Sequence, residues 1–204
     1  MKNVVDNFEL LGDLLFDGPM SLDDDEFYFL QVLVRGKDGN KVSGNNKNRL
    51  VKFYRITSKE QLFDLKDEIC LLCRVTNGRA YINPTPRNYK NVANLVVEDT
   101  VRTYVSQNYA GVISMYPTAC GKSFVREKRR YIVDIDDVDD ISDIAKYTQM
   151  IYDCGGDIKA TVPTRSGYHL VCSKFNTKRF SEKFPDVVIQ KNNPTLLYFE
   201  PKQM

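Results

Sequence analysis

The amino-acid sequence predicts an α+β fold built from antiparallel sheets with helices on one face. Three observations support this class. The 204 residues are 42% apolar and 27% charged, which are the proportions of an ordinary globular chain. Strand-like runs and helical periodicities are separated by turn signals rich in glycine, asparagine and proline. No run approaches the roughly 18 apolar residues that a membrane helix needs, so we expect no membrane contact.

The first half of the chain is predicted to form an α/β module over residues 1–110. Its elements are strands at 27–35, 49–56 and 79–82 and helices at 58–72 and 90–107. A polar loop rich in glycine and asparagine joins the first two strands, as in a long hairpin connection. Ser58 and Gln61 have the spacing of a capping box, which predicts the start of the first helix. Pro84 ends the third strand.

Residues 111–204 are predicted to form a second module, with the seam between the modules near 110–128. Its elements are strands at 131–136, 158–164, 168–173, 186–190 and 195–199 and helices at 141–153 and 177–183. Asp140 is suited to cap the first helix and Gly155 to end it. The β-α-β-β-α-β order builds an antiparallel sheet with helices on one face. The opposite face is expected to be free for a site.

The net charge of +2 favours no class of partner, but the charge is unevenly distributed along the chain. Residues 1–26 carry one lysine and eight carboxylates, residues 35–55 seven basic residues and one aspartate, and residues 158–191 seven basic and two acidic residues. An acidic cluster lies between the basic segments and consists of Asp134, Asp136, Asp137, Asp139 and Asp140. A site for metal and phosphate needs both signs of charge close together. For each charged run, a solvated surface is the alternative.

The five cysteines are expected to be free thiols, because their number is odd and nothing in the sequence indicates secretion. Cys70 and Cys73 form a CxxC pair, which raises the alternative of a zinc site. No second CxxC accompanies them, and the only histidine, His169, lies about a hundred residues away. Their spacing by three in a helical segment favours buried core thiols.

The string YIVDIDD, residues 131–137, carries the clearest candidate for catalytic chemistry. Side chains alternate along a strand, so Asp134 and Asp136 share one face and stand roughly 6–7 Å apart. Two carboxylates at that spacing can hold one divalent cation or lie between two, as in in-line phosphoryl transfer. Without a cation or basic neighbours the two carboxylates repel each other. The alternative is a strand end that runs into a polar turn and caps the next helix.

A second string, TVPTRSGYHL, contains His169 in a predicted strand. Gly167 lets a backbone or a ligand approach closely, and Arg165 supplies a forked donor suited to phosphate. The imidazole can donate a hydrogen bond to a phosphate oxygen or bind a metal. A half-buried sheet histidine satisfied by a neighbour is the alternative. If the two strings form adjacent strands, Asp134, Asp136 and His169 lie on one open face.

Two charged residues near the end of the chain and four tyrosines are further candidates. Lys191 ends the strand that begins at Asp186, so the lysine can reach a triphosphate and the carboxylate can join a metal site. Solvated strand-end charges are the alternative for both. The tyrosines that could stack on bases are Tyr54, Tyr81, Tyr116 and Tyr168, although most aromatic residues in strands pack in cores.

Together these strings resemble the catalytic core of the archaeo-eukaryotic primase superfamily, which includes the primase-polymerases. The resemblance is carried by Val133–Asp136, by the small-x-His string Gly167–His169, and by Pro185–Asp186 as a hydrophobic-acid motif. It covers residues 110–204, and the preceding part of the chain in outline. It implies an RRM-like β-α-β-β-α-β catalytic half packed on the N-terminal α/β module.

The resemblance also implies a site and a reaction. Asp134, Asp136 and Asp186 would be ligands of Mg²⁺ or Mn²⁺. The residues that would contact the incoming nucleotide are Arg165, Ser166, Gly167, His169 and Lys191. The expected reaction is attack of a 3′-hydroxyl on the α-phosphate of a nucleoside triphosphate, which extends short RNA or DNA on a single-stranded template. The basic segment 35–55 would bind the template backbone, and a helicase or another replication protein would be a partner.

The leading hypothesis is a metal-dependent primase or primase-polymerase-like nucleotidyltransferase with Asp134, Asp136 and His169 as catalytic residues. One alternative is a non-catalytic nucleic-acid-binding protein with the same fold. The other is a metal-dependent nuclease that uses the same carboxylates, with His169 as acid or base. We expect a cytoplasmic location, and the small stand-alone core suggests a phage or mobile-element source.

Overall fold

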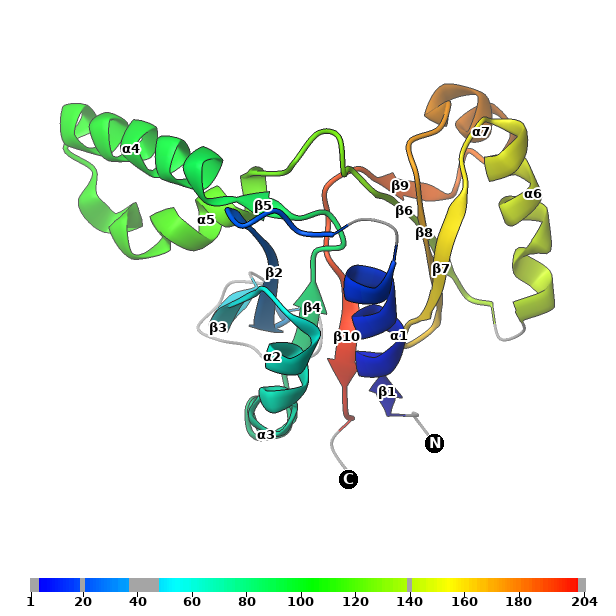
Figure 1. The fold of residues 1–204 in the computed structure, drawn as a ribbon, viewed down its shortest axis with the longest axis horizontal. Helices are drawn as coiled ribbons and strands as arrows, with labels where there is room; N and C mark the ends of the chain where they lie inside the picture. The colour runs from blue at the N-terminus through cyan, green and yellow to red at the C-terminus, as the bar shows by residue number, and fades with distance from the viewer. Residues whose placement is uncertain (1–3, 19–20, 37–47, 139–140, 202–204) are drawn as a thin grey trace.

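The computed structural model describes residues 4–18, 21–36, 48–138 and 141–201, which form two antiparallel sheets and their helices (Figure 1). The first sheet contains, in spatial order, β1 (Val5–Asp6), β10 (Thr195–Phe199), β4 (Arg79–Ile82), β2 (Glu26–Val34) and β3 (Arg49–Ile56), and β5 (Arg87–Asn88) pairs with β2. The second sheet contains, in spatial order, β7 (Ile158–Pro163), β8 (Gly167–Cys172), β6 (Tyr131–Asp136) and β9 (Val188–Gln190). The predicted α+β class is confirmed.

The helices fall into four groups. Between the sheets lie α1 (Phe8–Gly12) and its π-helical continuation η1 (Asp13–Asp17). The first sheet is covered by α2 (Lys59–Asp64) and α3 (Lys66–Thr76). A projecting group contains α4 (Tyr89–Ser106), the 3₁₀ helix η3 (Tyr109–Ser114) and α5 (Met115–Lys122). The outer face of the second sheet carries η4 (Ile141–Ile144), α6 (Ala145–Asp153) and α7 (Thr177–Lys183). Within the described residues, no helix has the length and apolar character to cross a membrane.

A single hydrophobic core joins the two sheets. Phe8 and Leu11 of α1 are fully buried and belong to the same cluster as Ile132 of β6, Val162 of β7 and Val171 of β8. The face of the second sheet that was expected to be free is therefore covered at one end by α1 and the first sheet. Burial of these apolar side chains stabilises the packing of the two sheets at roughly 25 cal/mol per Å². At the other end of the same face, which this core does not cover, the side chains are polar.

The helix predicted at 58–72 is interrupted at Leu65, which ends α2 and precedes α3. Its start follows the predicted capping box, because Ser58 Oγ accepts a hydrogen bond from the Gln61 amide at 3.1 Å. The Gln61 side chain reaches back to the amide of Thr57, at 2.8 Å, rather than to that of Ser58. The capping signal thus locates the helix start, whereas no residue type marks the break.

The last strand, β10, lies in the first sheet and not with the second module to which the predicted boundary at residue 110 assigns it. It runs between β1 and β4, and all five of its residues are buried. An apolar strand buried on both faces needs a paired neighbour on each side, and the first sheet supplies both. In the same way Ala119 and Cys120 of α5 pack against Phe27 and Phe29 of β2. The sequence boundary therefore does not coincide with the boundary between the sheets.

All five cysteines are free thiols in the structure. Cys73 lies within the core of the first sheet and Cys70 packs against it from the same helix, as expected for core thiols. Burial raises the pKa of the Cys73 and Cys172 thiols to about 12 and that of Cys120 to about 11. Because the thiolate is the reactive form, these three cysteines are held in an unreactive state.

We expect this burial to set the order of thiol modification. A rise in pKa from 9 to about 12 lowers the thiolate fraction near pH 8 by about a thousandfold, so iodoacetamide should label the half-buried Cys70 well before Cys73 and Cys172. All five thiols should react at similar rates in denaturant. Peptide mass spectrometry over time checks the order, and rapid native labelling of Cys73 or Cys172 would contradict the packing described here.

Candidate active-site cleft

Asp134 and Asp136 of the YIVDIDD string point away from the core of the second sheet. Along β6, Val133 and Ile135 are buried against the core under α6 and α7, whereas Asp134 is half-buried and Asp136 exposed on the opposite face. The alternation expected of a strand is thus observed, and both carboxylates line one cleft. Ile132, two residues earlier on the same face, joins the core that connects the sheets. The cleft therefore begins where this shared core ends.

His169 lies directly opposite Asp134 in the antiparallel pair of β8 and β6. Its Nε2 is 3.2 Å from Asp134 Oδ1, and its Nδ1 is 2.9 Å from Thr195 Oγ1. An ionised carboxylate only accepts hydrogen bonds, so Nε2 carries the proton in the neutral ring and Nδ1 accepts from the Thr195 hydroxyl. The second carboxylate oxygen of Asp134 accepts from Gln190 Nε2 at 3.0 Å. This network fixes both the ring and the carboxylate.

The end of β6 is shaped by a backbone contact with the turn before β8. Asp137 has a left-handed backbone, with φ of 58°, and its amide donates to the Ser166 carbonyl at 2.7 Å. The Ser166 hydroxyl donates to Asp136 Oδ1 at 3.3 Å. A Cβ on Gly167 would lie 2.0 Å from the Ile135 carbonyl oxygen, so only glycine fits. The close approach expected at Gly167 is thus made by the neighbouring strand.

The cleft between the two sheets has a volume of about 680 Å³ and contains both signs of charge. Its acidic lining residues are Asp134, Asp136 and Asp137, and its basic ones are Arg35, Arg79 and Arg165. The guanidinium carbons of Arg79 and Arg165 lie 4.7 and 5.7 Å from the centre of the Phe199 ring, so both cations are within cation–π distance of one aromatic ring of β10. Carboxylates for a cation and forked donors for an anion therefore meet in one space.

Some residues expected at the site lie elsewhere. Asp186 is exposed in the turn between α7 and β9, and it does not line the cleft. Lys191 does not line the cleft either; its ammonium lies 5.9 Å from the centre of the Tyr131 ring, and its carbonyl accepts from Arg129. Residues 37–47 of the basic segment lie outside the described residues, although Arg35 and Asn48 on either side line the cleft.

Of the four tyrosines considered for base stacking, only Tyr81 lines the cleft. It lies on β4 of the first sheet, across from the carboxylates, and is half-buried. Tyr54 is buried and its hydroxyl donates to Glu68 at 2.7 Å. Tyr116 and Tyr168 pack against hydrophobic clusters. The residues that local patterns did not single out for the site are Thr195, Gln190 and Arg79, because their positions depend on pairing between distant strands.

The donor set of the cleft suits a hard divalent cation that is completed by a phosphate-bearing substrate. Within the described part of the chain, no three side chains of the His, Cys, Asp and Glu types gather so as to hold a metal ion by themselves. Mg²⁺ commonly binds through one or two carboxylates together with substrate phosphates and water. Asp134 and Asp136 offer those two carboxylates on one face of β6. The residues present therefore fit a divalent cation whose remaining ligands come from water and a phosphate group.

Replacing Thr195 by valine is expected to release the ring of His169. The change keeps the shape of the side chain but removes the hydroxyl from Nδ1, and an unpaired buried polar atom costs about 1–3 kcal/mol of folding stability. Because His169 is the only histidine, its ring nitrogens can be assigned without ambiguity by NMR. Asp134 holds the Nε2 proton in all three proteins, so we expect the Nδ1 resonance to shift in Thr195→Val, where this nitrogen loses its donor, and to stay in place in Thr195→Ser. An unchanged ring spectrum in Thr195→Val would contradict the described network.

The chain was compared with protein families, curated proteins and solved structures. No family model, curated protein or solved structure matches it.

Proposed function

We propose that the chain is a primase or primase-polymerase-like nucleotidyltransferase that extends short RNA or DNA on a single-stranded template. The observation that carries this proposal is the pair Asp134 and Asp136, held beside His169 in a cleft whose walls also present three arginines. Phosphoryl transfer depends on positioning and on neutralising charge, and these side chains suit both tasks. A surface cluster of carboxylates would not need a buried histidine and a half-buried glutamine to fix one of them.

Each part of the cleft has a place in the proposed reaction. The attacking 3′-hydroxyl forms a bond to the α-phosphorus, the bond to the β-phosphate oxygen breaks, pyrophosphate leaves, and the proton of the hydroxyl goes to solvent. A Mg²⁺ or Mn²⁺ ion at Asp134 and Asp136 would lower the pKa of the hydroxyl and stabilise the leaving pyrophosphate. Arg79 and Arg165, which line the cleft, would bind phosphate oxygens through their forked donors. His169 holds Asp134 in place through Nε2.

Three further features support the resemblance to the primase-polymerase core. The elements β6, α6, β7, β8, α7 and β9 follow one another in the β-α-β-β-α-β order, and β6 and β8 are the central strands of an antiparallel sheet. Both motif-bearing strands are thus neighbours, as an RRM-like catalytic half requires. Tyr81, on the opposite wall, is available for stacking on a base. Arg35 and Asn48 join the basic segment to the cleft, where a template backbone would be bound.

The direct test is nucleotide incorporation by the purified chain. Labelled ribonucleoside and deoxyribonucleoside triphosphates are supplied separately with single-stranded templates, with and without primer, in Mg²⁺ and in Mn²⁺. The proposal predicts metal-dependent products longer than the primer or formed without one. Shortening of the nucleic acid without incorporation would instead assign a nuclease. Template binding that is independent of metal, with neither reaction, would assign a non-catalytic nucleic-acid-binding protein.

A further inference from the structure

The helices α4, η3 and α5 form an arm, residues 89–122, that projects from the first sheet (Figure 1). The base of the arm is anchored, because Val92 of α4 and Ala119 of α5 are buried against the aromatic side chains of β2. Lys122, at the end of α5 that joins the body, pairs with Asp99 at 3.5 Å and links the two helices. Beyond that pair η3 contains no buried residue. The outer part of the arm therefore lacks any contact with the body of the protein that would bury it.

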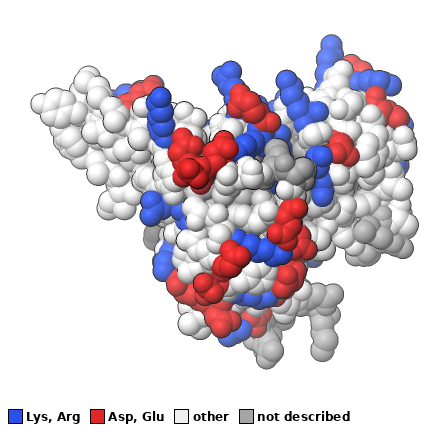
Figure 2. Space-filling view, viewed as in Figure 1, with Lys and Arg blue, Asp and Glu red and all other residues white. Residues whose placement is uncertain are grey.

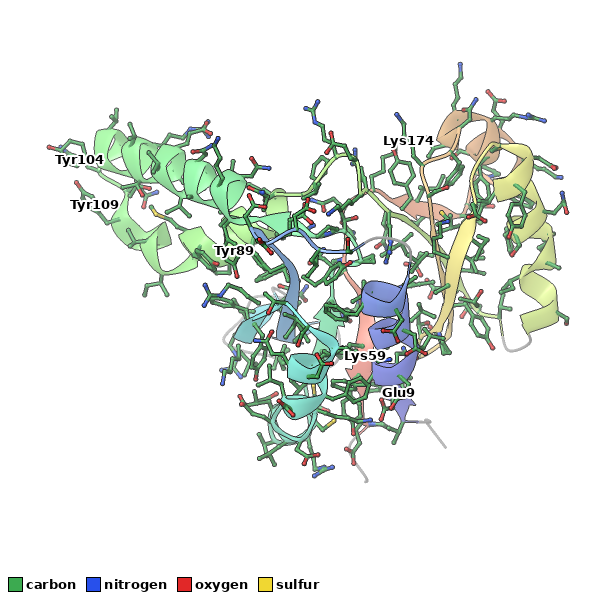
Figure 3. The ribbon with its side chains drawn as sticks, viewed as in Figure 1. Glu9, Lys59, Tyr89, Tyr104, Tyr109 and Lys174 are labelled. Atoms are coloured by element: carbon green, nitrogen blue, oxygen red, sulfur yellow. The ribbon has the colours of Figure 1, made fainter. Side chains whose placement is uncertain are left out.

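This outer part exposes seven large apolar side chains to solvent. On α4 the exposed apolar side chains are Val97, Val101, Tyr104 and Val105, which follow one another at helical spacing. On η3 they are Tyr109, Val112 and Ile113, and Ile113 is 95% exposed. Figure 3 shows Tyr104 and Tyr109 together at the far end of the arm. Half of the large apolar side chains that are exposed in the described residues thus lie within one short stretch, where a monomer would normally show isolated ones.

The charges on this stretch are few and balanced. Residues 97–113 contain only Glu98, Asp99 and Arg102, and Asp99 is already paired with Lys122. Glu98 and Arg102 face solvent as an i,i+4 pair at 2.6 Å. In Figure 2 the outer arm, at the upper left, is mostly without charged side chains. Such a surface lacks the positive charge that a polyanion such as nucleic acid would bind. It also carries too little net charge to repel a second copy of the chain.

We propose that the arm is a self-association surface through which two copies of the chain form a two-fold symmetric dimer. A whole tyrosine side chain has a surface of roughly 200 Å². With the exposed fractions of Tyr104 and Tyr109, these two residues together expose more than about 250 Å². The five aliphatic side chains bring the total to the order of the about 800 Å² that each partner contributes to a standard interface. Two-fold symmetry makes every contact reciprocal, so Glu98 and Arg102, which pair within one copy, would exchange partners with the same residues of the other copy and form two equal ion pairs.

Sedimentation equilibrium of the full chain over a range of concentrations tests this proposal. We expect a species of twice the 23.5 kDa chain mass that dissociates on dilution. Val105→Asp with Ile113→Asp should weaken the dimer by about 30-fold or more, because charges then enter the centre of the interface. Leu71→Asp with Val75→Asp, at exposed apolar positions of α3, is the matched control and should leave the dimer unchanged.

A charge exchange separates the interface from any folding defect. Glu98→Arg and Arg102→Glu should each weaken the dimer, whereas the double variant restores the reciprocal pairs and should dimerise as the original chain does. Circular dichroism in dilute solution confirms that each variant is folded. A chain that stays monomeric at every concentration overturns the proposal, and the arm would then be a surface for a different protein. A dimer that survives Val105→Asp with Ile113→Asp overturns it as well. Dimerisation does not depend on the chemistry of the cleft, so incorporation activity and self-association can fail separately.

Discussion

Replacing Asp134 and Asp136 together by asparagine is expected to reduce metal-dependent nucleotide incorporation by about a thousandfold or more. The reason is that the two carboxylates are the cation ligands of the proposed site. A thousandfold loss corresponds to about 4 kcal/mol of lost transition-state stabilisation. Asparagine has the same shape as aspartate, and the change removes the repulsion between two neighbouring charges. The melting temperature should therefore stay the same or rise while activity is lost, as is common at functional sites.

The matched control is Asp157→Asn. Asp157 is an exposed carboxylate paired with Lys159 and is not among the residues that line the cleft. Its replacement should leave incorporation within about twofold, because exposed ion pairs contribute little. Initial rates for the control, the double variant and the original chain decide the matter. Full activity of the double variant would refute the assigned role of the two carboxylates. Equal losses in both variants would mean that the effect is not specific to the cleft.

Gly167→Ala is expected to destabilise the fold by at least about 2 kcal/mol, because a new Cβ would meet the Ile135 carbonyl oxygen at 2.0 Å. The contact is with backbone of the paired strand, so β6 and β8 can only accommodate it by separating at the end that carries the carboxylates. Urea denaturation followed by circular dichroism measures the change in the free energy of unfolding. Incorporation should fall in parallel even well below the unfolding transition, because His169 and Asp134 are opposed across the same pair of strands.

Gly121→Ala is the control for the introduction of a methyl group. Gly121 lies in α5 with no atom within 4 Å of the added Cβ, and alanine is favoured over glycine in a helix. The variant should therefore be more stable by up to about 1 kcal/mol. If Gly167→Ala unfolded at the same urea concentration as the original chain, the close pairing of β6 and β8 at that position would be wrong.

The second half of the chain was the more predictable part of the fold because its local signals agree with one another. Alternation in the strand 131–136 places the two carboxylates on one face, and the turn before Gly167 brings His169 into the neighbouring strand. The observed bounds of β6 and α7 are those predicted, β7 ends one residue early, and β8 both begins and ends one residue early. These elements depend on hydrogen bonding and periodicity over a few residues, which local sequence describes well.

The remaining parts of the site depend on contacts between residues that are far apart in the chain. Thr195 reaches His169 because β10 returns to the first sheet, and no local pattern around Thr195 indicates that return. Arg79 and Tyr81 line the cleft opposite the carboxylates because the two sheets pack against each other, and no local pattern indicates that packing either. Conversely, Asp186 was assigned from its position before an apolar run, yet β9 begins only at Val188 and leaves the carboxylate in an exposed turn. A strand end predicted to within two residues does not determine where its first side chain points.

The arm shows the opposite difficulty. The helix predicted at 90–107 is observed at Tyr89–Ser106, but its apolar residues also run along the outward face, where Val97 and Val101 meet solvent. An apolar stripe is usually interpreted as the side that packs on the core. Here α4 has an inner stripe on β2 and α5 and an outer one without a partner in the described structure. Sequence periodicity alone does not separate the two.

Diffraction from crystals of the chain grown with Mn²⁺ and a non-hydrolysable nucleoside triphosphate analogue, measured at the manganese edge, tests the proposed site most directly. The proposal predicts anomalous density at the carboxylates of Asp134 and Asp136, with the triphosphate on the side of Arg79 and Arg165. Anomalous density elsewhere, or a nucleotide bound away from this cleft, would contradict the assignment of the cleft as a nucleotidyltransferase site.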